Sequence, residues 1–301
     1  MKILLTGGLG YIGYSLTKKL SEHHLIICSK SEHLNNENFK NIDLELVNIE
    51  SDNFLKVVEK HKPDLLIHLA SYAGLQNCEN NPHLAFATNV YGTYNVIKAC
   101  SLHNVRLIFL SSREVYGNTS NEIDENQILK PTNVYGLTKQ LSEKMIVSEH
   151  EKSSLNYTIL RITNVYGPGG TDGVNKIIQS SITKNQIVIN GGNQLINLIY
   201  IDDLVEAIIE TLNNEKSYNQ IFNVGSFNNI TLDEFSKLVS SSCKNNIQII
   251  YNTSLKFENS KFKPNVSKIK NILNFHSKTH IEDGIKKTIR WFEQNMDKNK
   301  N

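Results

Sequence analysis

Short apolar runs alternate with amphipathic stretches through the first two thirds of the chain. Residues 2–6 (KILLT), 64–70 (DLLIHLA) and 106–112 (RLIFLSS) are short and rich in branched aliphatic side chains, which is typical of buried strands. Residues 53–61 and 135–151 repeat apolar positions at helical spacing. Alternating strands and helices predict βαβ units. We therefore expect an α/β fold, a Rossmann-type doubly wound parallel sheet with helices on both faces.

The pattern changes at about Tyr166. A glycine-rich stretch, GPGGTDG, is followed by helical and strand-like segments that no longer alternate strictly, and Thr231 and Glu234 have the spacing of a helix capping box. We expect a first domain over residues 1–165, to which roughly 195–225 returns. A smaller mixed α/β domain is expected mainly over residues 166–301.

Composition and charge narrow the functional classes. Of the 301 residues, 39% are hydrophobic and 21% charged, as in a globular enzyme. The net charge of +2 is spread along the chain without a basic block, so we expect no nucleic-acid partner. No apolar run approaches the ~20 residues of a membrane span, and regular structure is expected from residue 3. These features predict a cytoplasmic protein without membrane association.

The cysteines and histidines show no spacing that indicates a metal site or a disulfide framework. The four cysteines lie far apart, none in a CxxC pair, and the ten histidines form no ligand pattern. We expect no metal and a reducing compartment.

The segment ILLTGGLGYIG carries the first chemical signal. It is a predicted strand that runs into a helix through four glycines. Such glycines permit a tight turn and allow backbone amides to approach a pyrophosphate, to which the helix N-terminus adds partial positive charge. A dinucleotide site is therefore expected here, with contacts from Gly7, Gly10, Tyr11, Ile12 and Gly13.

The end of the second predicted strand bears on which dinucleotide binds. An acidic residue about 20 positions beyond the glycines usually binds the 2′-hydroxyl of NAD, but HLIICSKS ends in Ser29 and Lys30 instead. A carboxylate would repel a 2′-phosphate, whereas serine and lysine can hold one. We expect NAD(P), with NADP slightly favoured over NAD. The alternative is that Lys30 simply points into solvent.

A tyrosine followed four residues later by a lysine indicates catalytic chemistry. This spacing puts the ammonium beside the phenol on one helical face, where the cation favours the phenolate that takes a proton from a substrate hydroxyl. The pattern occurs three times, beginning at Tyr14, Tyr94 and Tyr135. Only Tyr135 and Lys139 follow a strand that ends in hydroxyl residues. We therefore expect these two side chains to meet Ser112 at the carboxyl edge of the sheet.

Several segments together resemble those of the extended short-chain dehydrogenases/reductases of the NAD-dependent epimerase/dehydratase family. They include TGGLGYIG, KPDLLIHLAS, SSREVYG, YGLTK, RITNVYGPGG and IYIDDLVEAI, and the resemblance extends over nearly the whole chain. It implies an enzyme that oxidises a nucleotide-activated sugar at C4 by transient hydride transfer to a nicotinamide. Subunits of the family often pair through a four-helix contact, so a homodimer is expected.

The same resemblance implies roles for individual residues. Ser112 would hydrogen-bond the sugar O4, Tyr135 would act as the base, and Lys139 would bind the ribose and lower the pKa of the tyrosine. Asn164 would contact the substrate phosphates. The remaining dinucleotide contacts would come from Asn48, Ile49, Leu69, Ala70, Ser71, Asn89 and Ser111.

The turn Ser112-Arg113-Glu114 bears on which reaction of the family is catalysed. Relatives that remove the sugar C5 proton carry Thr-Asp-Glu or Thr-Ser-Glu here. Glu114 is therefore a candidate second acid or base, and Arg113 is predicted to reach an anionic substrate group. The alternative for this pair is a surface ion pair.

Three functional hypotheses follow from the sequence. The leading one is a sugar-nucleotide enzyme of epimerase/dehydratase type. The alternative is an NADPH-dependent 4-keto-sugar-nucleotide reductase, which Ser29 and Lys30 favour. A non-catalytic dinucleotide sensor is the third.

Overall fold

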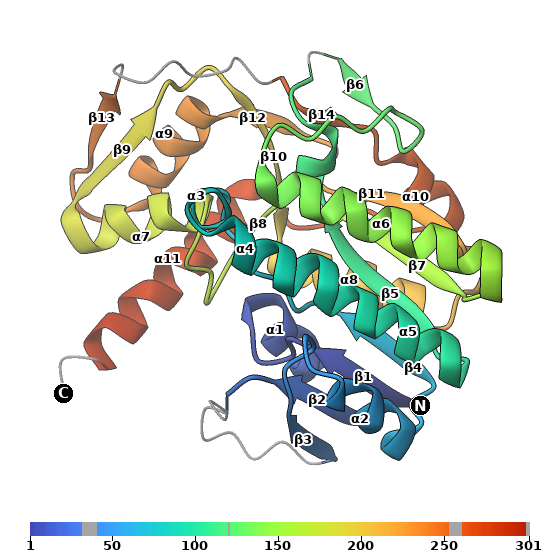
Figure 1. The fold of residues 1–301 in the computed structure, drawn as a ribbon. Coiled ribbons are helices and arrows are strands. Elements are labelled where there is room, and N and C mark those ends of the chain that lie inside the picture. The colour runs from blue at the N-terminus through green and yellow to red at the C-terminus, as the bar shows by residue number, and fades with distance from the viewer. Residues whose placement is uncertain (32–40, 120, 253–260, 299–301) are drawn as a thin grey trace. The chain divides into compact units, whose positions relative to one another are not determined.

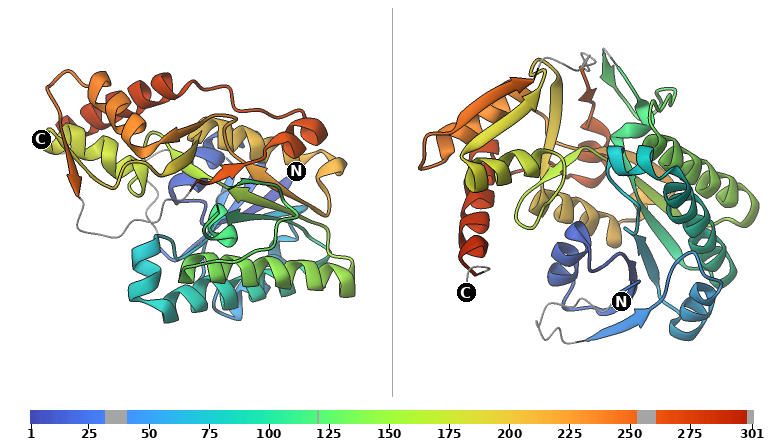
Figure 2. Two further views of the ribbon diagram at one scale, coloured as in Figure 1. Left: turned by 90° about the horizontal axis from the view of Figure 1, so that it is seen from above. Right: turned by 60° about the vertical axis from the view of Figure 1, so that its left-hand side comes forward.

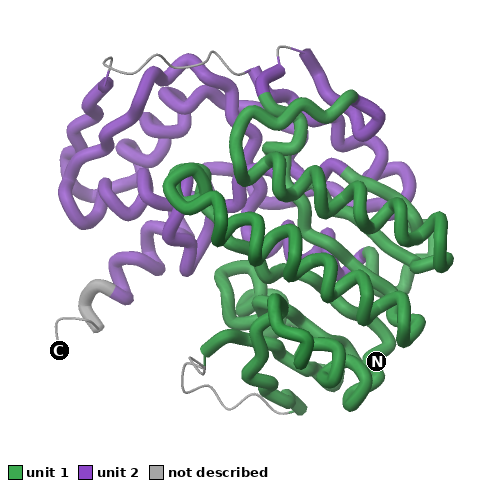
Figure 3. The backbone as a smooth tube through the Cα atoms, viewed as in Figure 1, with its two compact units in different colours: residues 1–117, 128–161, 211–222 green, residues 118–127, 162–210, 223–301 purple. Residues whose placement is uncertain are grey.

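The structure is a computed structural model, and residues 1–31, 41–119, 121–252 and 261–298 are described. Two compact units make up this part of the chain (Figure 3). Unit 1 contains residues 1–117, 128–161 and 211–222. Unit 2 contains residues 118–127, 162–210 and 223–301.

A seven-stranded sheet forms the centre of unit 1, in the order β11-β7-β5-β4-β1-β2-β3 (Figure 1). The pairs β1–β2, β2–β3, β1–β4 and β4–β5 are parallel. The strands are β1 (Lys2–Thr6), β2 (His24–Ser29), β3 (Ile42–Leu46), β4 (Leu65–His68), β5 (Arg106–Ser112), β7 (Tyr157–Ile162) and β11 (Gln220–Val224). Helices cover both faces, which confirms the predicted doubly wound α/β fold.

Helix α1 lies on one side of this sheet, and α2, α5 and α6 lie on the other (Figure 2). Apolar residues of the strands, such as Leu4, Leu66 and Phe109, are fully buried against Val96 and Ile146 of the second helical layer. The helices of unit 1 are α1 (Tyr11–Lys19), α2 (Asn53–His61), α3 (Leu75–Asn80), α4 (Pro82–Ala85), α5 (Thr93–His103) and α6 (Val134–Ser153). Three short turns complete it: the π-helix η1 (Phe86–Gly92) and the 3₁₀ turns η2 (Arg113–Tyr116) and η3 (Glu215–Ser217).

Unit 2 is a mixed α/β structure, as predicted for the smaller domain. In its three-stranded sheet β10 (Leu195–Tyr200) pairs parallel with β8 (Asn164–Tyr166) and antiparallel with β12 (Asn229–Thr231). Two parallel pairs join β9 (Gln186–Asn190) to β13 (Gln248–Asn252) and β6 (Glu122–Ile123) to β14 (Lys263–Pro264). The helices are α7 (Val174–Lys184), α8 (Ile201–Leu212), α9 (Leu232–Ser242), α10 (Ser267–Leu273) and α11 (Ile281–Lys298).

Helix α9 begins with the predicted capping box. The Thr231 hydroxyl oxygen accepts from the Glu234 amide (3.1 Å), and the Glu234 carboxylate accepts from the Thr231 amide (2.8 Å). Within the described ranges, no helix combines the length and the hydropathy that crossing a bilayer requires.

Candidate functional site

The glycine-rich turn between β1 and α1 leaves no room for side chains. Gly7 has a φ of +71°, and a Cβ atom there would lie 2.7 Å from the Ala70 nitrogen. A Cβ atom on Gly13 would lie 2.1 Å from the Gly7 carbonyl oxygen. These close approaches bring the backbone of the turn, the start of α1 and the end of β4 together, as a pyrophosphate cradle requires. The residues present therefore fit a dinucleotide.

A cavity of about 340 Å³ lies beside this turn, at the carboxyl ends of β1, β2 and β4. Eight of the predicted cofactor residues line it: Gly7, Gly10, Ser29, Lys30, Ile49, Leu69, Ala70 and Ser71. Four further residues line the cavity and were not predicted: Cys28, Val47, Tyr72 and Thr88. The first three belong to no recognisable motif. Thr88 lies on η1, far from the glycine turn along the chain.

Asn48 and Asn89 hold backbone segments next to the cavity. The Asn48 carbonyl Oδ1 accepts from the Glu50 amide at 3.0 Å. Asn89 Oδ1 accepts from Ser71 Oγ and from the Tyr72 amide, at 3.0 and 2.7 Å. Its Nδ2 donates to Thr138 Oγ1 of α6 at 3.0 Å. Asn89 thus links the segment after β4 to the helix that carries Tyr135.

Lys30 does not stand alone at the end of β2. Its Nζ donates to Glu50 Oε1 at 2.7 Å, and Thr88 Oγ1 donates to the same oxygen at 2.7 Å. Glu50 could not be predicted as part of the site, because it follows β3 and belongs to no motif. The expected slight preference for NADP rested on Ser29 and Lys30 as phosphate ligands, and this ion pair occupies the lysine.

Ser112, Tyr135 and Lys139 converge at the carboxyl end of β5. Ser112 ends the strand, and its hydroxyl and that of Ser71 lie close enough to the phenol of Tyr135 to favour its ionised form. Tyr135 lies in the first turn of α6, which Asn133 caps by accepting from the Gly136 amide at 2.7 Å. The Lys139 Nζ is 5.9 Å from the centre of the Tyr135 ring and donates to the Leu110 carbonyl at 2.8 Å.

Burial shifts the pKa values of the two α6 side chains in opposite directions. It raises the pKa of the Tyr135 phenol above its usual value, and the nearby hydroxyls of Ser71 and Ser112 only partly oppose this. It lowers the pKa of the Lys139 ammonium to about 8, against the attraction of Glu143. The net shift of the Tyr135 pKa in this structure is upward, and its lowering by Lys139 stays a prediction.

A buried polar network surrounds Glu143, one helical turn after Lys139 on α6. The Ser111 hydroxyl donates to Glu143 of α6 at 2.5 Å, and Arg161 of β7 donates to both carboxylate oxygens of Glu143 at 2.8 to 3.2 Å. Arg161 also donates to the hydroxyl of Tyr116 at 2.9 Å. The network connects β5, β7 and η2 to α6. It was not foreseen, because its members are far apart in sequence.

The turn after Ser112 contains the ion pair that was the alternative interpretation of Arg113. Arg113 Nε donates to Glu114 Oε1 at 2.7 Å, and Asn133 Nδ2 donates to Glu114 Oε2 at 2.8 Å. Both charged side chains are largely covered rather than fully solvated. Asn164 belongs to β8 of unit 2, where its Nδ2 donates to the Asn197 carbonyl at 3.2 Å.

Known proteins similar to this chain catalyse several related reactions. A UDP-N-acetyl-alpha-D-glucosaminuronate decarboxylase of Bacillus cytotoxicus is 28% identical over 97% of this chain and 98% of its own. A dTDP-D-glucose 4,6-dehydratase of Dictyostelium discoideum is 27% identical over 98% of this chain and 82% of its own. The crystal structure of a UDP-glucose 4-epimerase of Thermotoga maritima with UDP-glucose is 26% identical and has a TM-score of 0.91, covering 98% of this chain and all of the other.

The family itself follows from a match over most of the chain. Residues 3–225 match the family model described as the NAD dependent epimerase/dehydratase family, a range that includes the glycine turn and the Ser112, Tyr135 and Lys139 cluster. The central sheet, the cavity and this match agree, and the chain belongs to the NAD-dependent epimerase/dehydratase family.

Proposed function

We propose that the protein interconverts nucleotide-activated sugars that differ in configuration at C4. The convergence of Ser112, Tyr135 and Lys139 at the carboxyl end of β5, close to the dinucleotide cavity, is the observation that carries this proposal. When bound, the nicotinamide accepts a hydride from C4 and can return it to the other face of the sugar.

The residues of the chain supply orientation and proton transfer. Ser112 lies next to the phenol of Tyr135, where it can bind the sugar O4. Tyr135 takes the proton of the C4 hydroxyl and later gives it back. Because burial holds the phenol in its neutral form, the base is formed only when positive charge is close, and Lys139 is the protein cation next to it. Asn164 is proposed to contact the phosphates of the substrate.

Epimerisation is favoured over the other reactions by two observations. The reductase alternative drew on Ser29 and Lys30 as ligands for NADPH, and Lys30 is paired with Glu50. Removal of a C5 proton needs a carboxylate that is available to the sugar, but each oxygen of Glu114 accepts a hydrogen bond from the protein. The role of Glu114 at C5 stays a prediction.

All four cysteines are free thiols, which supports a cytoplasmic enzyme.

Replacement of Tyr135 by phenylalanine tests the proposed function. We expect Tyr135→Phe to lower turnover by about 10²- to 10⁴-fold, because the C4 hydroxyl then loses its proton acceptor, while dinucleotide affinity is retained. The substrates are a panel of UDP-, GDP-, CDP- and dTDP-sugars, and proton NMR identifies the products. Epimerisation leaves the absorbance at 340 nm unchanged, whereas reduction consumes NADPH in proportion to product.

The matched control is Tyr94→Phe, which alters another tyrosine that precedes a lysine by four residues. Tyr94 lies on α5, and we expect this variant to keep full turnover. Turnover that survives Tyr135→Phe would contradict the proposed role. A bound dinucleotide with no product from any sugar would instead favour the sensor hypothesis.

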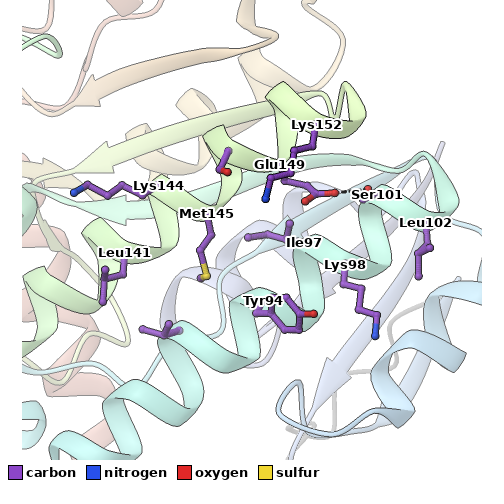
Figure 4. A pocket seen from close by; sticks show the side chains of 12 residues that line it. Tyr94, Ile97, Lys98, Ser101, Leu102, Leu141, Lys144, Met145, Glu149 and Lys152 are labelled. Atoms are coloured by element: carbon purple, nitrogen blue, oxygen red, sulfur yellow. Dashed lines mark hydrogen bonds between the residues drawn. The ribbon is translucent and has the colours of Figure 1, made fainter.

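We further propose that two copies pair through the faces of α5 and α6. A groove of about 540 Å³ runs between these helices (Figure 4). Apolar parts of Tyr94, Ile97, Leu102, Leu141 and Met145 line it, with lysines at its margins. Leu102 is 64% exposed and Tyr94 is 48% exposed, so the helices present apolar surface that a second copy would cover. The α5 and α6 helices of the two copies would together form a four-helix contact of the kind expected for the family.

A further inference from the structure

We propose that Glu50 makes the cofactor site selective for NAD over NADP. It would do so by placing a carboxylate next to Lys30, at the end of β2, where the sequence itself has no acidic residue. The inference rests on the proposed function only in requiring a nicotinamide dinucleotide in the cavity, and it does not depend on the sugar or on the reaction.

One carboxylate oxygen of Glu50 connects two residues that line the cavity. Oε1 of Glu50 accepts from Lys30 Nζ and from Thr88 Oγ1, each at 2.7 Å. Lys30 directly follows β2, and Thr88 lies on η1, so the bridge joins two separate walls of the cavity. The Glu50 backbone is held in place as well, because its amide donates to Asn48 Oδ1 at 3.0 Å.

The carboxylate is ionised at neutral pH. Partial burial alone would raise the pKa of Glu50, but hydrogen bonds from Lys30 and Thr88 outweigh it, and the net effect lowers that pKa. The Glu50 side chain is 25% exposed and that of Lys30 is 56% exposed. The carboxylate of Glu50 is therefore less exposed to solvent than the ammonium group of Lys30.

Lys30 is the only charged residue among the described residues that line the cavity. A 2′-phosphate carries close to two negative charges at neutral pH and needs cationic partners. To reach Lys30 it would have to displace Glu50 or lie beside it, and both cost electrostatic free energy. The 2′-hydroxyl of NAD carries no charge, and a carboxylate is its usual partner in this fold. Ser29 does not change this balance, because its hydroxyl donates to the Ser31 carbonyl at 2.9 Å.

Direct binding measurements test the proposal without any sugar substrate. Dissociation constants of NAD⁺ and NADP⁺ are measured by isothermal titration calorimetry for the wild-type protein and for Glu50→Gln. We expect the wild-type protein to bind NAD⁺ more tightly by about tenfold or more, and Glu50→Gln to reduce this ratio by about tenfold, mainly through tighter binding of NADP⁺. The gain in NADP⁺ affinity should fall as salt is added, since it comes from an exposed lysine.

Two further variants separate the proposal from a general change in charge. Glu45→Gln removes a carboxylate that contacts Lys60 at 2.7 Å and His61 at 2.6 Å, outside the residues that line the cavity, and should leave the ratio unchanged. Lys30→Met leaves the Glu50 carboxylate without its cation, so we expect it to weaken NADP⁺ binding more than NAD⁺ binding, and in combination with Glu50→Gln it should abolish the gain for NADP⁺. This variant also keeps the test decisive if Glu50→Gln does not fold.

Three results would overturn the inference. The first is a wild-type protein that binds NADP⁺ as tightly as NAD⁺, and the second is an unchanged ratio in Glu50→Gln. The third is a loss of NAD⁺ affinity in Lys30→Met as large as any loss for NADP⁺. A failure of the proposed sugar chemistry would look different, because turnover would then be absent while the ratio of the two dissociation constants still responded to Glu50→Gln.

Discussion

Burial is the main influence on the pKa values of the ionisable side chains in the site. Desolvation raises the pKa of Tyr135 and lowers that of Lys139 to about 8, so each group resists the charge that catalysis requires of it. Paired shifts of this kind are common where proton transfer takes place. The Ser112 hydroxyl acts in the opposite direction on Tyr135 and favours the phenolate.

His68 illustrates the same effect in a residue outside the proposed proton transfer. It is fully buried at the end of β4, between Thr6 Oγ1 at 2.6 Å and Thr93 Oγ1 at 3.0 Å. The Thr93 hydroxyl already donates to the Asn89 carbonyl, so His68 Nε2 donates to Thr93, and Nδ1 accepts from Thr6. The network therefore stabilises the neutral imidazole. Burial and the nearby Lys139 lower its pKa to about 3.

Stability should therefore depend on pH through His68. Between pH 6.5 and about 3 the unfolded chain binds a proton at this histidine and the native protein does not, so acid favours unfolding. We expect this residue to reduce the free energy of unfolding by about 1.4 kcal/mol per pH unit below pH 6. Urea unfolding from pH 7 to pH 4 measures it. His68→Gln should lose less stability per pH unit, whatever its stability at pH 7, and equal slopes would contradict the assignment.

Helix α6 is the element on which the site depends most. Its N-terminal turn carries Tyr135 and its second turn Lys139, and Glu143 one turn later anchors it to Arg161 of β7 and to Ser111 of β5. On its other side Asn89 of the π-helix η1 binds Thr138. Single π-helical turns often occur at functional sites, and here one directs Asn89 towards α6. These contacts determine where the tyrosine and lysine lie relative to the end of β5.

We expect Glu143→Gln to destabilise the protein by about 3–5 kcal/mol. The buried guanidinium of Arg161 would keep its charge but lose the carboxylate that compensates it. Urea denaturation at neutral pH measures the loss. Asp172→Asn is the control, because it breaks an exposed ion pair with Lys176, 2.9 Å long, which should contribute less than about 1 kcal/mol. Similar losses for the two variants would show that the Glu143 network does not stabilise this region.

Pairing of two copies is the prediction at the scale of the whole molecule. Leu102→Glu places a charge on the apolar α5–α6 groove, and we expect it to convert a dimer into a monomer at micromolar concentration, because an unpaired buried charge opposes association. Sedimentation velocity measures the change. Ile128→Glu is the control, since Ile128 is 72% exposed but lies outside the groove. A monomeric wild-type protein, or a Leu102→Glu variant that remains dimeric, would exclude this interface.

Much of the architecture was predictable from local patterns. Strand and helix periodicity indicated the doubly wound sheet, and the glycine spacing indicated the turn where Gly7 and Gly13 leave no space for a Cβ atom. The order of segments was sufficient to choose Tyr135 over Tyr14 and Tyr94, because parallel strands bring their carboxyl ends to one edge. The domain arrangement was harder, since residues 118–127 and 211–222 each leave their sequence neighbours to join the other unit.

The sequence by itself determined the features that arise from residues close together along the chain: the βαβ alternation, the glycine turn, the helical spacing of Tyr135 and Lys139, and membership of the family. Tertiary structure alone decided what lies next to these residues. Lys30 meets Glu50 only because β2 pairs with β3, and Glu143 meets Arg161 only because α6 packs against the sheet that contains β7. The charge that surrounds a binding group depends on such contacts, and we therefore infer the choice of NAD from the fold rather than from the residues at the end of β2.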